Sequence, residues 1–164
     1  MFKRIPLLLA LLASSQAQAQ WTYSESKDKI SGEVTAYATT RSTNSERFAF
    51  PYHGGSRLNL QVRQEESGKT FILFAIDRGQ FFCDLDACSV RVKFDDETDV
   101  YPVVGAADGS SDVLFIDLED RFLKYLKQSK RLMVEAAFYR EGKHTFEFKI
   151  ASLRWPVNKK ATER

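Results

Sequence analysis

Apolar and polar residues alternate with a period of two through most of this 164-residue chain. In residues 56–64, "SRLNLQVRQ", the apolar residues Leu58, Leu60 and Val62 are separated by charged or amide side chains. Successive side chains of a strand point to opposite faces, so this pattern predicts a half-buried β-strand. The same pattern recurs in residues 34–40, 89–94 and 145–150.

Turn residues separate the predicted strands. Gly68 in "EESGK" and Gly142 in "REGKH" each lie between two strand-like segments, where glycine permits the positive φ of a tight turn. Both segments therefore predict β-hairpins, and hence antiparallel pairing. Residues 70–76, "TFILFAI", are apolar on both faces, which predicts a central strand whose outer face is covered by another element.

Residues 117–130, "DLEDRFLKYLKQSK", have helical periodicity. Asp117 is the expected N-cap, acidic residues occupy the first turn and lysines the last, which suits the helix dipole. We expect this helix to cover the outer face of residues 70–76. The predicted fold is mainly β, an antiparallel β-sandwich or twisted sheet with one packed helix. The apolar stripe of the helix consists of Leu118, Phe122, Leu123 and Leu126.

The first twenty residues, "MFKRIPLLLALLASSQAQAQ", have the layout of a secretory signal peptide. A basic start precedes an apolar run and a small-residue cleavage site, and we expect cleavage after Ala19. The alternative is a leader that is retained as a membrane anchor. No later stretch reaches the roughly 18 apolar residues that a membrane helix needs, so we expect no membrane span and a periplasmic location.

Cleavage leaves one β-rich domain, residues 20–157, and a polar tail, residues 158–164. It also removes Lys3 and Arg4, so the 24 basic residues of the full chain fall to 22 and equal the 22 acidic ones. A nucleic-acid-binding protein normally needs a basic surface to displace counterions from phosphates. The sequence therefore predicts no nucleic-acid partner, and it shows no motif for a cofactor.

Both cysteines, Cys83 and Cys88, lie in "GQFFCDLDACSVRVKFDD", residues 79–96. In an exported protein such a pair indicates a disulfide. The Cys-x4-Cys spacing differs from the Cys-x2-Cys of redox motifs, and the two histidines are too isolated to complete a zinc site. We predict a disulfide that ties the turn "DLDA" shut between two strands.

Acidic residues gather in "FDDETD" and "AADGSSD". Calcium takes six to eight oxygen ligands, so two such loops would suit it if they converged. Neither loop has EF-hand spacing, and Asp and Ser are ordinary turn formers, so solvated turns are the simpler interpretation. The alternative function is a small calcium-dependent carbohydrate binder, or a glycoside hydrolase that uses a carboxylate pair. Its candidate residues, in loops 95–99 and 108–112, are Asp95, Asp96, Asp99, Asp108 and Asp112.

The segment "FPYHGG" places Tyr52 and His53 beside two glycines. A histidine on such a loop suits a general base, but the sequence shows neither a partner nor a Gly-x-Ser-x-Gly nucleophile elbow. We therefore expect His53 to be exposed in a turn, and His144 to face solvent at the start of a strand. Phe81 and Phe82 adjoin, so one of them should point away from the core.

An outward phenylalanine either packs under the helix or marks a contact site. Tyr139 and Trp155 are likewise not assigned to the core by the alternation. The residues that we single out for a possible interaction are Tyr52, His53, Phe81 and Phe82.

Several segments resemble those of a group of small exported proteins from Gram-negative bacteria. The resemblance extends from about residue 21 to residue 155 and lies in strands and turns. The order "RVKFDD", a Ser/Asp stretch, a helix and two closing strands is also similar, more distantly, to the TagO/VasI accessory proteins of type VI secretion. That similarity implies an accessory role in the envelope without chemistry. The segments are "SRLNLQVR", "GQFFC", "CSVRVKFDD", "SSDVLFI", "FLKYLKQSKRLMVEAAFY" and "FEFKIASLRW".

The sequence thus favours a non-enzymatic periplasmic protein that binds another envelope or secreted protein. The contact would use a sheet edge or an aromatic patch, and an accessory, inhibitor or immunity-like role fits this description.

Overall fold

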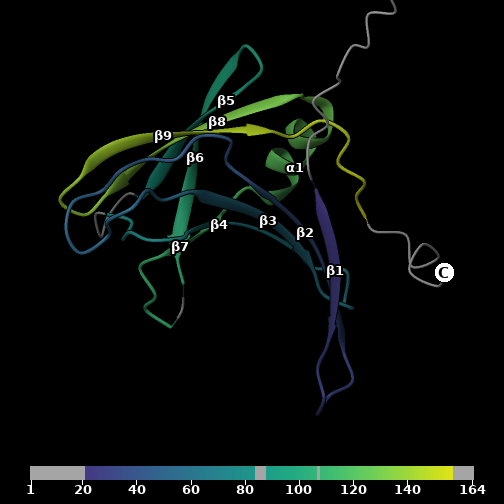
Figure 1. The fold of residues 1–164 in the computed structure, drawn as a ribbon. Coiled ribbons are helices and arrows are strands. Elements are labelled where there is room, and N and C mark those ends of the chain that lie inside the picture. The colour runs from purple at the N-terminus through teal and green to yellow at the C-terminus, as the bar shows by residue number, and fades with distance from the viewer. Residues whose placement is uncertain (1–20, 84–87, 107, 157–164) are drawn as a thin grey trace, which may run out of the picture.

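A computed structural model of the protein describes residues 21–83, 88–106 and 108–156. The predicted leader, the "DLDA" turn and the polar tail after residue 157 lie outside these residues. The described chain forms one antiparallel sheet and one helix, so the mainly β prediction is confirmed (Figure 1). The elements are β1 (Thr22–Lys27), β2 (Val34–Arg41), β3 (Leu58–Gln64), β4 (Thr70–Ile76), β5 (Ser89–Phe94), β6 (Glu97–Gly105), β7 (Val113–Ile116), α1 (Glu119–Gln128), β8 (Arg131–Phe138) and β9 (Gly142–Lys149).

Along the sheet the strands follow the order β1-β2-β3-β4-β7-β6-β5-β8-β9. Strand β6 pairs with β5 through residues 97–102 and with β7 through residues 103–105, so it joins two halves of the sheet. The halves fold over each other, with β1–β4 forming one layer and β5, β8 and β9 the other (Figure 1). The rings of Phe74 in β4 and Phe148 in β9 meet between the layers, with centroids 6.4 Å apart.

The core consists of the side chains that the alternation directs inward. Each contributes about 1.5–3 kcal/mol when fully removed from water. Both hairpins predicted around Gly68 and Gly142 are present, as β3–β4 and β8–β9. Every residue of the three clearest alternating segments that was expected to face inward is buried, namely Leu58, Leu60, Val62, Val90, Val92, Phe94, Phe146, Phe148 and Ile150.

Helix α1 begins two residues later and ends two residues earlier than predicted, and its N-cap is Leu118, without a side-chain cap hydrogen bond. Its buried Phe122 packs against Phe74, Phe94 and Tyr101, with ring centroids 6.0, 5.0 and 5.1 Å away. Since Phe74 points into the core, the helix packs on the inner face of β4 and closes one side of the two layers. The predictions of an Asp117 cap and of a helix over the outer face of residues 70–76 are wrong.

Neighbouring strands cover the outer face of β4 instead. Leu73 lies between Gln61 of β3 and Phe115 of β7 and is only 8% exposed. The cations of Arg63 and Lys69 lie 4.5 and 4.6 Å from the ring centroid of the adjacent Phe71. A strand that is apolar on both faces therefore needs no helix on its outer side here.

Residues 42–46, the crossing segment, carry the chain from β2 to the outer edge of β9. The backbone N–H of Thr43 donates to the carbonyl of Glu147. The Asn44 side chain accepts from the N–H of Glu147 and donates to the carbonyl of Thr145. This segment covers the edge of β9, whereas β1 pairs only with β2 within the described chain.

Candidate functional site

Three buried phenylalanines form an aromatic base at one end of the fold. Phe48 follows the crossing segment, Phe81 lies before the disulfide, and Phe138 ends β8. The ring centroids of Phe48 and Phe81 each lie 4.9 Å from that of Phe138, and each of the three side chains is at most 7% exposed. Offset and tilted contacts of this kind stabilise more than their buried area alone.

Three exposed aromatic rings lie at the same end of the fold as this base, and we call Phe50, Phe82 and Tyr139 the aromatic end. They are 82%, 52% and 48% exposed. The rings of Phe82 and Tyr139 lie 6.5 Å apart, and the Ala49 N–H donates to the carboxylate of Glu141. Two loops distant in sequence are thereby held at the same end of the molecule, at the left of Figure 1.

The adjoining Phe81 and Phe82 behave as the strand period requires. Phe81 bridges Phe138 and points inward, whereas Phe82 donates its N–H to the Ala137 carbonyl and points outward. Gly79 lets this segment approach the base, because its φ is +148° and a Cβ there would lie 2.7 Å from the Phe48 ring. The outward phenylalanine does not lie under the helix.

Cys83 and Cys88 form a disulfide, with their Cα atoms 4.8 Å apart, so the predicted pair is confirmed. The segments on either side of it run in the same direction, however. Phe81 pairs antiparallel with Phe138, and Arg91 pairs antiparallel with Glu135 of the same strand, β8. The disulfide therefore links two segments that both run along β8, and the prediction that these segments are strands facing each other is wrong, while the "DLDA" turn itself lies outside the described residues.

His144 is not solvent-facing, contrary to the sequence prediction. Its side chain is 19% exposed, Nδ1 lies 3.1 Å from the Glu46 carboxylate, and its ring contacts Phe48 edge-on at 4.8 Å. Glu46 also accepts a hydrogen bond from Asn44. His144 therefore helps to hold the crossing segment against β9 and to support the aromatic base.

The loop 47–55 places Tyr52 and His53 differently. Tyr52 is partly buried against the core, whereas His53 is exposed, as predicted, with its ring 5.7 Å from that of Phe50. Beside Phe50, a hollow of about 540 Å³ is lined by Ser45, Arg47, Phe48, His53, Gly54 and Gly55. Of the candidate interaction residues, Phe82 and His53 lie at the surface of this end, and Phe81 and Tyr52 support it from below. Sequence reasoning did not single out Phe50, although it is the first residue of the "FPYHGG" segment.

The acidic loops do not share a site. Asp95 and Asp96 precede β6 and Asp99 lies near its start, whereas Asp108 and Asp112 follow its other end, and the nine residues of β6 span roughly 30 Å. Asp95 accepts hydrogen bonds from the N–H groups of Lys130 and Arg131, and Asp99 pairs with Arg121 at 2.5 Å. Among the residues that the structure describes, no group of three or more His, Cys, Asp and Glu side chains is placed to hold a metal ion.

The other acidic candidates are likewise engaged locally or in solvent. Asp108 accepts from the N–H of Ser110, Asp112 from the Ser110 hydroxyl, and Asp96 is exposed. These are the contacts of ordinary turns.

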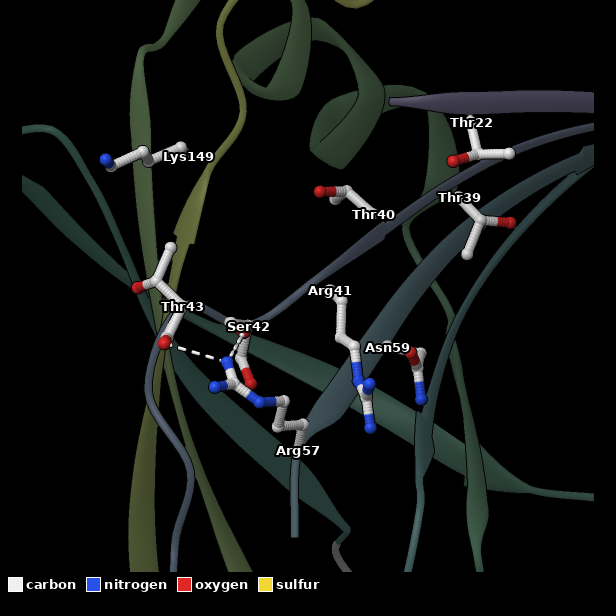
Figure 2. Close-up of a pocket in the computed structure, with 9 residues that line it drawn as sticks. All are labelled: Thr22, Thr39, Thr40, Arg41, Ser42, Thr43, Arg57, Asn59 and Lys149. Atoms are coloured by element: carbon white, nitrogen blue, oxygen red, sulfur yellow. Dashed lines mark hydrogen bonds between the residues drawn. The ribbon is translucent and has the colours of Figure 1, made fainter. Parts of the chain in front are cut away.

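A hollow of about 800 Å³ lies where β2 leaves β1 for the crossing segment, and we call it the polar hollow (Figure 2). Its side chains do not converge. In Figure 2 Lys149 points away from the others, and Thr40 points to the opposite side of β2 from Arg41. The lining residues are Thr22, Thr39, Thr40, Arg41, Ser42, Thr43, Arg57, Asn59 and Lys149.

The two arginines of the polar hollow already have partners in the chain. The Arg57 guanidinium donates to the carbonyls of Ser42 and Thr43 at 2.6 and 2.8 Å. Burial would raise the pKa of the Asp77 carboxyl, but hydrogen bonds from Arg41 and Asn59 outweigh it and hold that pKa below its ordinary value. These contacts hold neighbouring segments together at the hollow, so its arginines have a structural role.

Comparisons with protein-family models, with curated proteins and with solved structures found no match. No helix in residues 21–83, 88–106 and 108–156 has the length and hydrophobicity that crossing a membrane requires. What can be proposed for this chain accordingly rests on its own geometry.

Proposed function

We propose that this chain is a non-enzymatic binding protein that docks on another exported protein through the aromatic end. The observation that carries the proposal is the gathering of exposed Phe50, Phe82 and Tyr139 around a buried aromatic base. Protein interfaces are enriched in aromatic residues and arginine, and a few such side chains supply most of the binding energy.

The surroundings of the exposed rings support the proposal because they hold two of these rings in place before a partner binds. Phe82 is held by a backbone hydrogen bond to β8 and by the adjacent Cys83–Cys88 disulfide. Tyr139 is held by its N–H, which donates to the carbonyl of Gln80, and the Arg140 guanidinium lies 5.1 Å from its ring centroid. Groups ordered before binding lose less conformational entropy on association, which favours affinity.

A sheet edge is the other surface that the sequence favoured. One outer edge, that of β9, is covered by the crossing segment, and the other, that of β1, carries the charged residues Glu25 and Lys27. We therefore assign the partner to the aromatic end, where apolar rings are exposed.

The cellular setting belongs to the same proposal. We place the protein in the periplasm, with its leader cleaved after Ala19, because a leader of that layout and a disulfide both suit export into an oxidising compartment. The resemblance to TagO/VasI accessory proteins supports an accessory role, and an inhibitor or immunity-like role uses the same surface.

The test is site-specific photo-crosslinking in the native host. A photoreactive phenylalanine analogue at position 82 should capture one discrete partner from the envelope, whereas the same analogue at Val104, which is 54% exposed on β6, should not. In a pull-down of that partner, the triple variant Phe50→Ala, Phe82→Ala and Tyr139→Ala should lower recovery at least about tenfold, with Val104→Ala as control, because hot-spot truncations cost about 2 kcal/mol or more each.

The proposal fails if position 82 captures nothing that position 104 does not, or if the triple variant recovers the partner as well as the wild type. All three side chains are exposed, so their truncation should leave the thermal midpoint close to that of the wild type.

A further inference from the structure

The hairpin of β1 and β2 extends away from the two-layered body at the lower right of Figure 1. Its turn is well defined, because the Asp28 carboxylate accepts hydrogen bonds from the N–H groups of Ile30 and Ser31 at 2.8 and 2.6 Å. The distal residues of β1 are exposed. Within the described chain, no segment pairs with the outer edge of this strand.

The register shows which backbone groups of β2 face β1. Ser42 donates its N–H to the carbonyl of Leu58, so β2 residues with even numbers direct their backbone groups toward β3. Thr43 donates to Glu147 on the other side, so residues with odd numbers direct theirs away from β3. Within β2 these odd-numbered residues therefore pair through their backbone with β1.

The same parity fixes the free edge of β1. Thr39 stands opposite Thr22, and Tyr37 opposite Ser24, so residues of β1 with even numbers direct their N–H and carbonyl groups toward β2. The residues whose backbone groups face the open edge are Tyr23, Glu25 and Lys27.

The C-terminal segment contacts one side chain of this strand. The Tyr23 hydroxyl accepts a hydrogen bond from the N–H of Arg154, and the Arg154 guanidinium lies 5.1 Å from the Tyr23 ring centroid. The C-terminal segment therefore contacts the proximal end of β1. Glu25 and Lys27 remain, and neither has an ion-pair partner among the described residues, their neighbours on β2 being Ala36 and Val34.

Charges on an edge strand usually oppose pairing with another strand. Here the two charges have opposite sign and are two residues apart, which makes the edge complementary to itself in one register. If two copies met antiparallel about Glu25 or about Lys27, like charges would stand directly opposite and repel. If they met about Ser26, each Glu25 would stand opposite the other copy's Lys27, and both residues would present backbone groups to the partner strand.

We propose that a second copy of this chain pairs with β1 antiparallel, with the two-fold axis at Ser26, through the backbone and charges of Glu25 and Lys27. In this register residue 22 of each copy stands opposite residue 30 in the turn of the other, so the paired stretch begins at the body of one copy and ends at its turn. The paired surface is small, which makes the association weak and dependent on concentration.

Cysteine cross-linking tests the register. The two Ser26 residues form a non-hydrogen-bonded pair with Cα atoms about 4.5 Å apart, a spacing that a disulfide can bridge. Ser24 is exposed on the same face of β1, but in this register the two copies of Ser24 are offset by about 13 Å. Ser26→Cys should therefore form a disulfide dimer at protein concentrations up to about 1 mM, where even a millimolar Kd leaves dimer populated, and Ser24→Cys should not.

Charge reversal in the Ser26→Cys background tests the pairs. Glu25→Lys and Lys27→Glu should each lower the rate of cross-linking about tenfold, because two attractive pairs become two repulsive ones. The double reversal should restore the rate, and so should a mixture of the two single reversals, which would cross-link as a heterodimer.

Equal cross-linking at positions 24 and 26, no cross-linking at about 1 mM, or single reversals that change nothing would each overturn the proposal. Non-reducing gels and mass spectrometry should confirm that Cys83 and Cys88 remain paired with each other. The readout does not involve Phe82 or Tyr139, so its failure leaves the proposed function untouched.

Discussion

The aromatic end and the polar hollow adjoin the same crossing segment, but they differ in what their side chains do. The polar hollow is the larger cavity, yet its Arg57 and Arg41 groups are bonded to the chain's own carbonyls and to Asp77. The aromatic end has only a modest hollow, yet it exposes Phe82 and Tyr139 on a packed base. Exposed apolar rings on a packed support, and not cavity volume, therefore distinguish the surface that we propose for a partner.

The largest expected effect separates the base from the rings that it supports. Phe138→Ala removes the ring that both Phe48 and Phe81 contact, and it should lower the free energy of unfolding by about 3–5 kcal/mol. Phe82→Ala, at an exposed site, should change it by no more than about 0.5 kcal/mol. Urea denaturation of both variants measures the difference. Similar losses for the two would contradict the division into buried base and exposed contact.

Arg57→Ala tests whether the polar hollow is structural. The substitution removes a charged donor from the carbonyls of Ser42 and Thr43, and should lower the free energy of unfolding by about 1.5–3 kcal/mol. Lys149→Ala is the matched control, since this exposed lysine has no ion pair among the described residues and should change stability by no more than about 0.5 kcal/mol. If Arg57→Ala were as stable as the wild type, its hydrogen bonds would not be needed for folding. The wild-type arginine could then serve a ligand, and the contrast between the polar hollow and the aromatic end would not hold.

Gly79→Ala tests how closely the backbone must approach the aromatic base. A Cβ at position 79 would lie 2.7 Å from the Phe48 ring, so the variant should lose about 1–3 kcal/mol of stability through overpacking and backbone strain. Gly109→Ala also has a positive φ, of +78°, but meets nothing within 4 Å, so it isolates the strain from the clash. Equal losses in the two variants, by thermal unfolding, would mean that Phe48 yields easily and that the base is loosely packed.

The alternation predicted β5 to the residue and β2 and β3 within two residues at each end, because one face of each strand is buried. The apolar run of residues 70–76 predicted β4 to the residue. Strand β6 was not predicted, and the reason is physical. Its outward side chains Val100, Pro102 and Val104 are exposed although apolar, while Asp99 begins the inward row, so polar and apolar residues do not alternate. The periodicity of residues 117–130 likewise identified the apolar stripe of α1, but a stripe does not specify which face of a sheet it meets.

The candidate site was also predicted only in part from the sequence. Cysteine spacing identified the disulfide. Four intervening residues can connect two strands that face each other or two segments that run along the same neighbouring strand, so local spacing could not choose between them. Adjacency predicted that one of Phe81 and Phe82 points outward. The position of Phe50 at the aromatic end follows from the hydrogen bond between Ala49 and Glu141. These residues are 92 positions apart, so no local sequence pattern predicts the contact.

The smallest expected effect concerns the rim of the polar hollow and depends on pH. The pKa of Asp77 is lower in the folded state than in the unfolded state, where it is about 3.9. Asp77 therefore stabilises the fold fully at pH values above the unfolded-state pKa, and this contribution is lost as the pH falls through the folded-state pKa. Because the pair with Arg41 is largely solvent-exposed, the contribution should be no more than about 1 kcal/mol. Asp77→Asn keeps the shape but cannot titrate, so its stability should match the wild type at low pH and fall slightly below it at neutral pH. A difference that instead grows as the pH falls would mean that Asp77 is destabilised by its surroundings, and that the hollow holds a charge that its own arginine and asparagine do not satisfy.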